Sequence, residues 1–149
     1  MSSVTIDRSS LSLSDLVIDE ALNATYVLLL GSRLRRPAVT WRKTAAPNSV
    51  DVHGTEFIAA VKENTDYPFR VMVQANTTAD LDAAIDELDE ALSQFAYPVT
   101  VDLGGVLKVW AASPAPWAPE SDLAEAQAVA AFFEVLTVTI PVYPIPGTV

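Results

Sequence analysis

Residues 69–75, Phe-Arg-Val-Met-Val-Gln-Ala, run without a break into residues 76–81, Asn-Thr-Thr-Ala-Asp-Leu. The first stretch alternates apolar and polar side chains, which is typical of a half-buried strand. Its apolar face consists of Phe69, Val71 and Val73. The second stretch contains Thr77 followed by Asp80, a capping-box pattern that marks a helix start. The sequence therefore predicts a strand that leads directly into a helix.

The residues after this start predict one amphipathic helix over about 78–95. Its apolar residues recur at spacings of four and three positions and so share one stripe: Leu81, Ile85, Leu88, Leu92 and Phe95. The candidate acidic face lies largely on the other side: Asp82, Asp86, Glu87, Asp89 and Glu90. No basic residue is near in the sequence, so pairing along the helix cannot neutralise these carboxylates. This face is either bare to solvent or reserved for a partner.

Strand patterns surround the helix on both sides. Those before it are residues 4–6, 11–18, 26–30, 38–42, 56–63 and 67–75. After it, residues 97–103 and 106–112 flank Gly104-Gly105, which is a two-residue hairpin signal.

The C-terminal third is less regular. Residues 113–119 predict a proline-tryptophan loop. Residues 121–134 fit either a helix or a strand, and we expect a long strand over about 129–143 that ends in a proline-rich tail, about 141–149.

These elements predict an α+β fold that is mainly β. We expect antiparallel sheets arranged like a β-sandwich, with the helix packed on them. The chain has 149 residues, of which 50% are hydrophobic, and this length is typical of one domain. No linker divides it, so we expect a single domain over residues 1–149.

The charge is unevenly distributed along the chain. Residues 1–70 hold 8 basic and 8 acidic residues, whereas residues 71–149 hold 1 and 11, so the net charge of −10 belongs to the second part. An acidic chain lacks the cations that hold DNA phosphates, and we expect no sequence-specific nucleic-acid binding. Five basic residues cluster within eleven positions: Arg33, Arg35, Arg36, Arg42 and Lys43. They form either a solvated strand face or a patch that meets the acidic half of a neighbouring copy.

The sequence offers no catalytic, metal-binding or cofactor-binding residue. There is no cysteine, and the single histidine, His53, sits in a turn with no metal-ligand or triad spacing around it. Trp41 and Trp110 lie in strand patterns and are expected in the core. Trp117 lies between prolines and is the best candidate for an exposed anchor at a protein interface.

Neither end of the chain predicts a membrane or secretion signal. The N-terminus lacks a basic segment followed by an apolar one. Residues 135–149 are uncharged, but Pro141, Pro144 and Pro146 interrupt them, so we expect no membrane span.

The order of elements carries a family resemblance over about residues 11–142. It combines the strand and helix of residues 69–92 with four further segments: Trp41-Arg-Lys43, Val52-His-Gly-Thr-Glu56, Val109-Trp-Ala-Ala112 and Leu136-Thr-Val-Thr-Ile-Pro141. This pattern resembles minor tail proteins of actinobacterial siphophages and, more distantly, the N-terminal ring domain of distal tail proteins.

The resemblance implies a non-enzymatic structural protein of the virion, assembled in the cytoplasm of the bacterial host. It implies a hexameric ring of copies between the tail tube and the tip, or hub, proteins that recognise the host. DNA passes through such a ring, and the surplus of carboxylates suggests a lumen that does not hold phosphate.

Three other interpretations stay open. A tail terminator or a tail tube subunit also combines sheets with one helix. A carbohydrate-binding module or small hydrolase of the virion would use Trp117 for sugar stacking. The last is a soluble cellular protein unconnected with phages.

Overall fold

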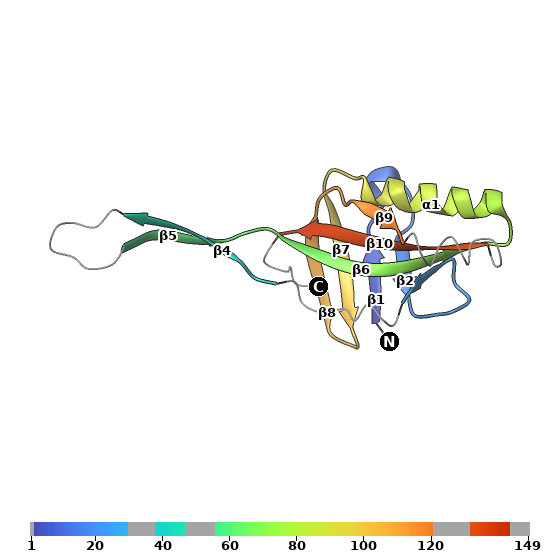
Figure 1. Cartoon of the computed structure of the whole chain (residues 1–149), viewed down its shortest axis with the longest axis horizontal. Helices are drawn as coiled ribbons and strands as arrows, with labels where there is room; N and C mark the ends of the chain where they lie inside the picture. Colours follow the sequence, from blue (N-terminus) through green and yellow to red (C-terminus); the bar gives the residue numbers. More distant parts are fainter. Residues whose placement is uncertain (1, 30–37, 47–55, 121–131, 144–149) are drawn as a thin grey trace.

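The computed structural model describes residues 2–29, 38–46, 56–120 and 132–143. In this part the fold is mainly β with one α-helix, as expected, and seven strands close into a barrel (Figure 1). The barrel strands are β1 (Ser2–Ile6), β2 (Leu16–Asp19), β3 (Tyr26–Leu28), β6 (Thr65–Gln74), β7 (Tyr97–Leu103), β8 (Leu107–Ala112) and β10 (Phe133–Val142). Their order is β6-β3-β2-β1-β7-β8-β10, and pairing of β10 with β6 completes the circle.

The expectation of a sandwich is wrong, because the strands form one closed sheet rather than two stacked ones. The closing contacts are distant in sequence. β10 pairs with β6 along its whole length, from Phe133 opposite Gln74 to Val142 opposite Thr65, and Val142 also pairs with Ala112 of β8. Inward and outward residues alternate along the strands of both a sandwich and a barrel, so the sequence pattern does not distinguish the two folds.

The interior of the barrel is filled by the inward residues of each strand. In β6 the expected alternation is confirmed: Phe69, Val71 and Val73 are buried, and the residues between them are partly exposed. All three residues of β3 are buried, as a continuous apolar run predicts. Trp110 is also buried and meets Tyr67 edge to face, with ring centroids 6.2 Å apart.

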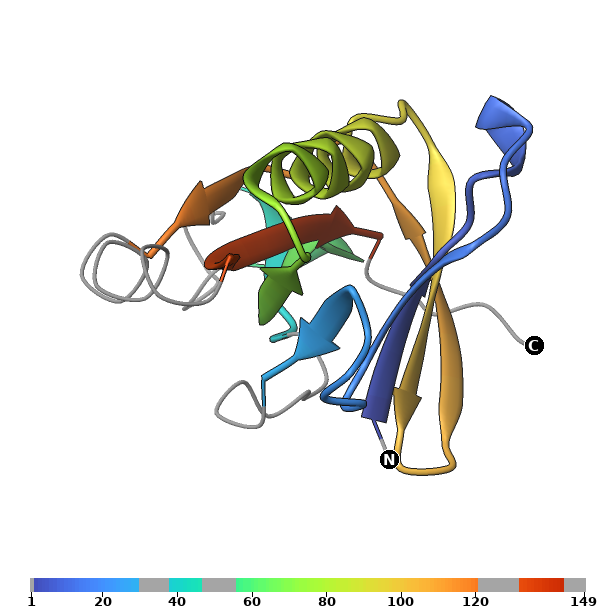
Figure 2. The ribbon, with the colours of Figure 1, turned by 90° about the vertical axis from the view of Figure 1, so that its right-hand side faces the viewer.

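Helix α1 (Thr78–Leu92) lies across one side of the barrel (Figure 2). Thr77 caps it as predicted, because its hydroxyl accepts a hydrogen bond from the Asp80 amide at 3.1 Å. Leu81, Leu88 and Leu92 are buried and join the same apolar core as the strands. Helix and barrel therefore share one core.

The helix ends earlier than predicted. Ser93 closes it by donating both its amide and its hydroxyl to the Asp89 carbonyl. Phe95 lies beyond this end and is 90% exposed, so its expected place on the buried stripe is wrong. Gln94 is buried in its stead, and its amide donates to the carbonyls of Asp7 and Ala91.

The strand expected over residues 11–18 is shorter and starts later. A 3-10 turn, Ser9–Leu11, precedes β2, and Ser12 adopts a positive φ of 58° that no strand contains. The Asp7 carboxylate accepts hydrogen bonds from the hydroxyl and amide of Ser9, which lower the pKa of Asp7 and hold the turn. Local side-chain bonds of this kind compete with strand pairing.

The predicted hairpin at Gly104-Gly105 joins β7 and β8, and both glycines have positive φ. The loop expected over 113–119 contains a short strand, β9 (Trp117–Pro119), which pairs with β10. The long C-terminal strand is confirmed over 133–142, so Pro141 belongs to it rather than to a tail. Residues 121–131 and 144–149 lie outside the described part, as does the choice between helix and strand at 121–131.

Candidate assembly surface

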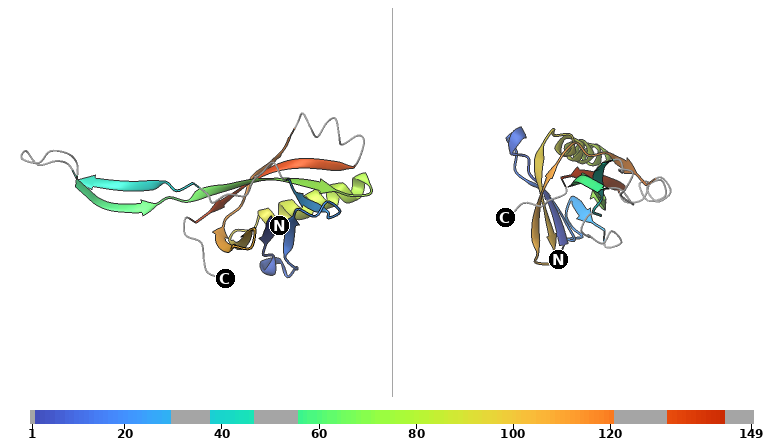
Figure 3. Two further views of the ribbon diagram at one scale, coloured as in Figure 1. Left: turned by 90° about the horizontal axis from the view of Figure 1, so that it is seen from below. Right: turned by 90° about the vertical axis from the view of Figure 1, so that its left-hand side faces the viewer.

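A two-stranded arm extends from the barrel (Figures 1 and 3). It consists of β4 (Trp41–Ala46) and β5 (Glu56–Lys62), which pair with each other in a sheet separate from the barrel. The Glu63 amide donates to the Thr40 carbonyl at 2.9 Å, and the chain then enters β6. The arm is thus an outward continuation of a barrel strand.

The described side chains of the arm are exposed and include an aromatic residue. Trp41 is 52% exposed, which corrects its expected place in the core. Its cross-strand partner is Lys62, whose Nζ lies 5.7 Å from the centroid of the indole ring. Val39, just before the arm, is 55% exposed. The base of the arm therefore offers apolar surface beside a cation.

The basic cluster is only partly within the described residues. Arg42 lies in β4 with an exposed side chain, and of Lys43 only the backbone is described. Arg33, Arg35 and Arg36 lie outside the described part, and so does His53. Three cations that the cluster did not include make contacts in the structure: Lys62 on the arm, Arg8 in the turn after β1, and Arg70 of β6, which pairs with Glu120.

All five residues of the acidic face are exposed on α1, but two of them are used within the chain. Glu87 forms an ion pair with Arg8 at 2.5 Å. Arg8 is 6% exposed, and its guanidinium also donates to the Ser14 carbonyl. Glu87 is thus not bare to solvent, although no basic residue is near it in the sequence, because its partner comes from the turn after β1.

Asp89 is the second carboxylate used within the chain. It accepts a hydrogen bond from the indole Nε1 of Trp117 at 2.7 Å. Trp117 is partly buried and packs against the core, so it ties β9 to α1 and is not free in a loop. The polar atom of its ring is therefore already engaged within the chain.

The other three carboxylates, Asp82, Asp86 and Glu90, have no hydrogen bond or ion pair with any described residue. They are spaced four residues apart and form one line along the outside of α1. We call these three residues the acidic stripe. Like charges at this spacing repel one another in an isolated helix.

In the described residues no three side chains among His, Cys, Asp and Glu come together to bind a metal. The strongly perturbed groups are tyrosines. Burial raises the pKa of Tyr67 to about 12 and also raises the pKa of Tyr97 and Tyr26. These phenols lie in the core, where they stay protonated.

Neither a protein-family model nor a curated protein matches this chain. Among the described residues no helix is long and apolar enough to cross a membrane.

The sequence located the acids and the cations but not their pairing. Arg8 carries no sequence signal, since it stands alone in a polar turn. The sequence does not indicate the exposure of Trp41 either, because apolar and polar residues alternate in the same way in an arm strand and in a barrel strand.

Proposed function

We propose that this protein is a structural subunit of a phage tail, which forms a ring of copies between the tail tube and the tip apparatus. The phage assignment rests on the resemblance of residues 11–142. Support for self-assembly comes from one observation above all, the arm that extends from the barrel.

An isolated two-stranded hairpin is marginally stable in water. The arm has no third strand among the described residues, and it leaves Trp41 half exposed. A partner that covers the arm would bury this indole and supply the missing packing. Aromatic residues of this kind are common anchors at protein interfaces.

Charge suggests that the partner is another copy. The arm carries Arg42 and Lys62, whereas α1 carries the acidic stripe. Unlike patches on one chain favour head-to-tail contacts, which close into cyclic rings. We therefore expect the arm of one copy to meet α1 of the next.

Carboxylates of the ring that do not contact an arm are suited to line a lumen through which DNA slides, because their negative charge repels phosphate. An ordered ring whose lumen is lined by Arg33, Arg35 and Arg36 would contradict this detail without affecting the ring itself.

The deciding experiment is particle localisation with a copy count, by cryo-electron microscopy of whole virions. Six copies in a ring at the end remote from the capsid would support the proposal. Absence from the virion, together with a purified protein that stays monomeric at high concentration, would refute it.

The arm also fits a second candidate, a tail tube subunit, because an arm of this kind can reach into the next ring of a stack. Many copies along the whole tail would favour that function, whereas one ring next to the capsid would favour a terminator. The carbohydrate-binding alternative gains no support, since Trp117 packs against the core and its indole nitrogen donates to Asp89. We propose no enzymatic activity and no cofactor.

A further inference from the structure

The outward side of strand β8 is apolar, like its buried side. Leu107, Val109 and Ala111 point outward and alternate with buried residues such as Trp110. Leu107 is 49% exposed, and Ala111 is exposed as well. Strands that are apolar on both sides are typical of sheets covered on both sides, whereas a solvated outer side is usually polar. The outward side of β8 therefore fits a covering partner.

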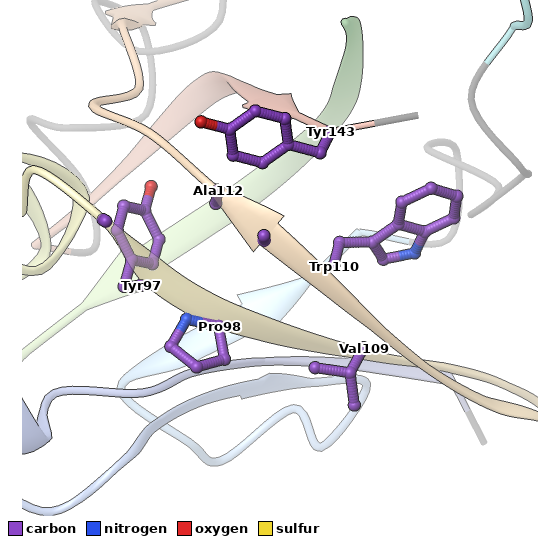
Figure 4. Close-up of a pocket in the computed structure, with 8 residues that line it drawn as sticks. Tyr97, Pro98, Val109, Trp110, Ala112 and Tyr143 are labelled. Carbon is purple, nitrogen blue, oxygen red and sulfur yellow. The ribbon is translucent and has the colours of Figure 1, made fainter. Parts of the chain in front are cut away.

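This side contributes to an apolar groove of about 510 Å³, which we call the β8 groove (Figure 4). Val109 and Ala111 line it together with Pro98 of β7, and Tyr143 stands at its rim. The side chain of Tyr143 is 56% exposed. Ligand pockets of proteins have volumes of roughly 300–1,000 Å³ and mostly apolar linings. A single aromatic side chain therefore fits into the β8 groove.

Negative charge borders the β8 groove at both ends. Asp102 of β7 lies opposite Leu107, and Asp66 of β6 lies opposite Pro141, two positions before the rim. Both carboxylates are on the outward side of the barrel, because they alternate with buried residues of their strands. Lys108, the cation of β8, is on the inward side. The groove thus suits an apolar anchor with a cation beside it.

The base of the arm carries such an anchor. The indole of Trp41 is 52% exposed, and the Nζ atom of Lys62 lies 5.7 Å from its centroid. The two residues are cross-strand partners and so share one face of the arm. Arg42, the next residue, is on the opposite face and stays available to α1. Tryptophan is among the residues in which the binding energy of interfaces concentrates.

The anchor and the β8 groove are neighbours on one copy. Val142, just before the rim of the groove, pairs with Thr65. Two residues earlier in the chain, the Glu63 amide bonds to the Thr40 carbonyl, next to Trp41. A two-fold axis satisfies two such adjacent surfaces together, because each copy then gives its anchor and receives one. A head-to-tail contact instead uses surfaces on different sides of the molecule.

We propose that two copies pair about a two-fold axis, with Trp41 of each copy seated in the β8 groove of the other. Lys62 enters beside the indole and approaches the carboxylates that border the groove. This inference rests on the proposed function only in that the arm mediates self-assembly. It adds a second contact to the head-to-tail contact between the arm and α1.

Photo-cross-linking tests the contact without removing the aromatic anchor. Benzoylphenylalanine replaces Trp41, and copies labelled with ¹⁵N are mixed with unlabelled ones, so that mass spectrometry distinguishes links between copies from links within one. We expect links from position 41 to residues 109–111 of a second copy, and covalent products no larger than dimers. The same cross-linker in place of Leu22, which is 77% exposed at a distant loop, is the control and should not reach β8.

Each other result of this experiment has a definite meaning. A ladder of larger covalent products would overturn the two-fold axis, and links within one copy would overturn the contact between copies. Links to α1 without links to β8 would overturn this inference and leave the proposed function standing. A protein that stays monomeric in native mass spectrometry and forms no links would refute both.

A matched pair of substitutions tests the groove itself. Ala111→Glu places a carboxylate in the β8 groove and should raise the dissociation constant of the pair by about tenfold or more. Ala118→Glu, on the exposed side of β9, is the control and should leave it unchanged. Urea denaturation checks that both variants fold with equal stability. Equal effects of the two variants on pairing, or no effect of Ala111→Glu, would overturn the proposal.

The occupant of the groove is tested by dilution. The chain has no cysteine, so Ala111→Cys introduces a single thiol at the floor of the β8 groove. Its reaction with a maleimide should be slow in concentrated protein and become fast on dilution. Slow reaction at every concentration would show that a segment of the same chain fills the groove, and fast reaction at every concentration would show that no copy does. Either result would overturn the proposal.

Discussion

At the scale of residues, a few long-range polar contacts hold the helix on the barrel. Arg8 reaches Glu87 and the Ser14 carbonyl, and the Tyr26 hydroxyl donates to the Ala84 carbonyl at 2.7 Å. Gln94, just after the helix, connects it to the N-terminal turn, because its side-chain amide donates to the Asp7 carbonyl. Two other phenols, those of Tyr67 and Tyr97, are buried without a hydrogen-bond partner among the described residues. The first group of contacts should stabilise the fold, and the second pair of hydroxyls should not.

Replacing Arg8 by methionine should lower the free energy of unfolding by about 1–3 kcal/mol, because it removes the donor of the Ser14 carbonyl and the ion pair of Glu87. Urea denaturation measures this. Arg42→Met, the same change on the exposed arm, is the control and should shift stability by less than about 0.5 kcal/mol. Equal effects of the two variants would contradict a structural role for Arg8.

Tyr97→Phe and Tyr67→Phe should leave stability unchanged or raise it by up to about 1 kcal/mol, since each removes a buried hydroxyl that bonds to no residue the structure describes. Tyr26→Phe should lower stability by about 1 kcal/mol, because it deletes the bond to Ala84. Thermal or urea unfolding of the three variants checks the contrast. A loss of stability in Tyr97→Phe as large as in Tyr26→Phe would show that its hydroxyl has a partner.

The buried tyrosines predict a loss of stability in alkali. The pKa of Tyr67 is raised from 10.0 to about 12 by burial, so the folded state retains the proton longer than the unfolded state. Ionisation of this phenol therefore leaves stability unchanged below pH 10 and lowers it as the pH rises from 10 towards 12. Urea denaturation between pH 8 and 12, with phenolate absorbance as a second signal, measures it. Tyr67→Phe should make the decline shallower, and a flat profile would contradict burial.

At the scale of elements, α1 has two edges with different partners. Glu87 and Asp89 connect it to Arg8 and Trp117, whereas the acidic stripe has no partner among the described residues. Repulsion between these like charges lowers the stability of the helix itself. The arm is the complementary element, because it exposes cations and an indole.

Asp86→Asn should raise the stability of the isolated subunit by a few tenths of a kcal/mol, because it relieves repulsion within the acidic stripe. It should at the same time weaken self-association, which analytical ultracentrifugation measures. Asp89→Asn is the matched control on the same helix: it weakens the bond to Trp117 and should not stabilise the subunit. Unchanged association of Asp86→Asn would argue against the stripe as an interface.

At the scale of the whole molecule, barrel and helix form one body with a shared core, and the arm reaches beyond it. The arm contributes nothing to the described core cluster, so changes on its surface should alter assembly rather than folding.

The double variant Arg42→Glu, Lys62→Glu should keep the stability of the subunit and abolish the ring, as measured by native mass spectrometry. Adding Asp82→Arg and Asp86→Arg to the same chain should restore the ring, because the charges of the two patches are then exchanged and attract each other again. Glu63→Gln, beside the arm, is the control and should leave the ring intact. Rings that form equally in all variants would show that the two patches do not meet.

What the sequence by itself determined is local. The alternation in residues 69–75, the cap at Thr77 and the Gly104-Gly105 hairpin each depend on neighbours within a few positions, and all three are present in the structure. Closure of the barrel, the exposure of Trp41 and Phe95, and the pairing of Arg8 with Glu87 were decided by tertiary structure. These depend on contacts such as that of Val142 with Ala112, between residues far apart in the chain, and a local periodicity carries no information about which distant strand becomes the neighbour.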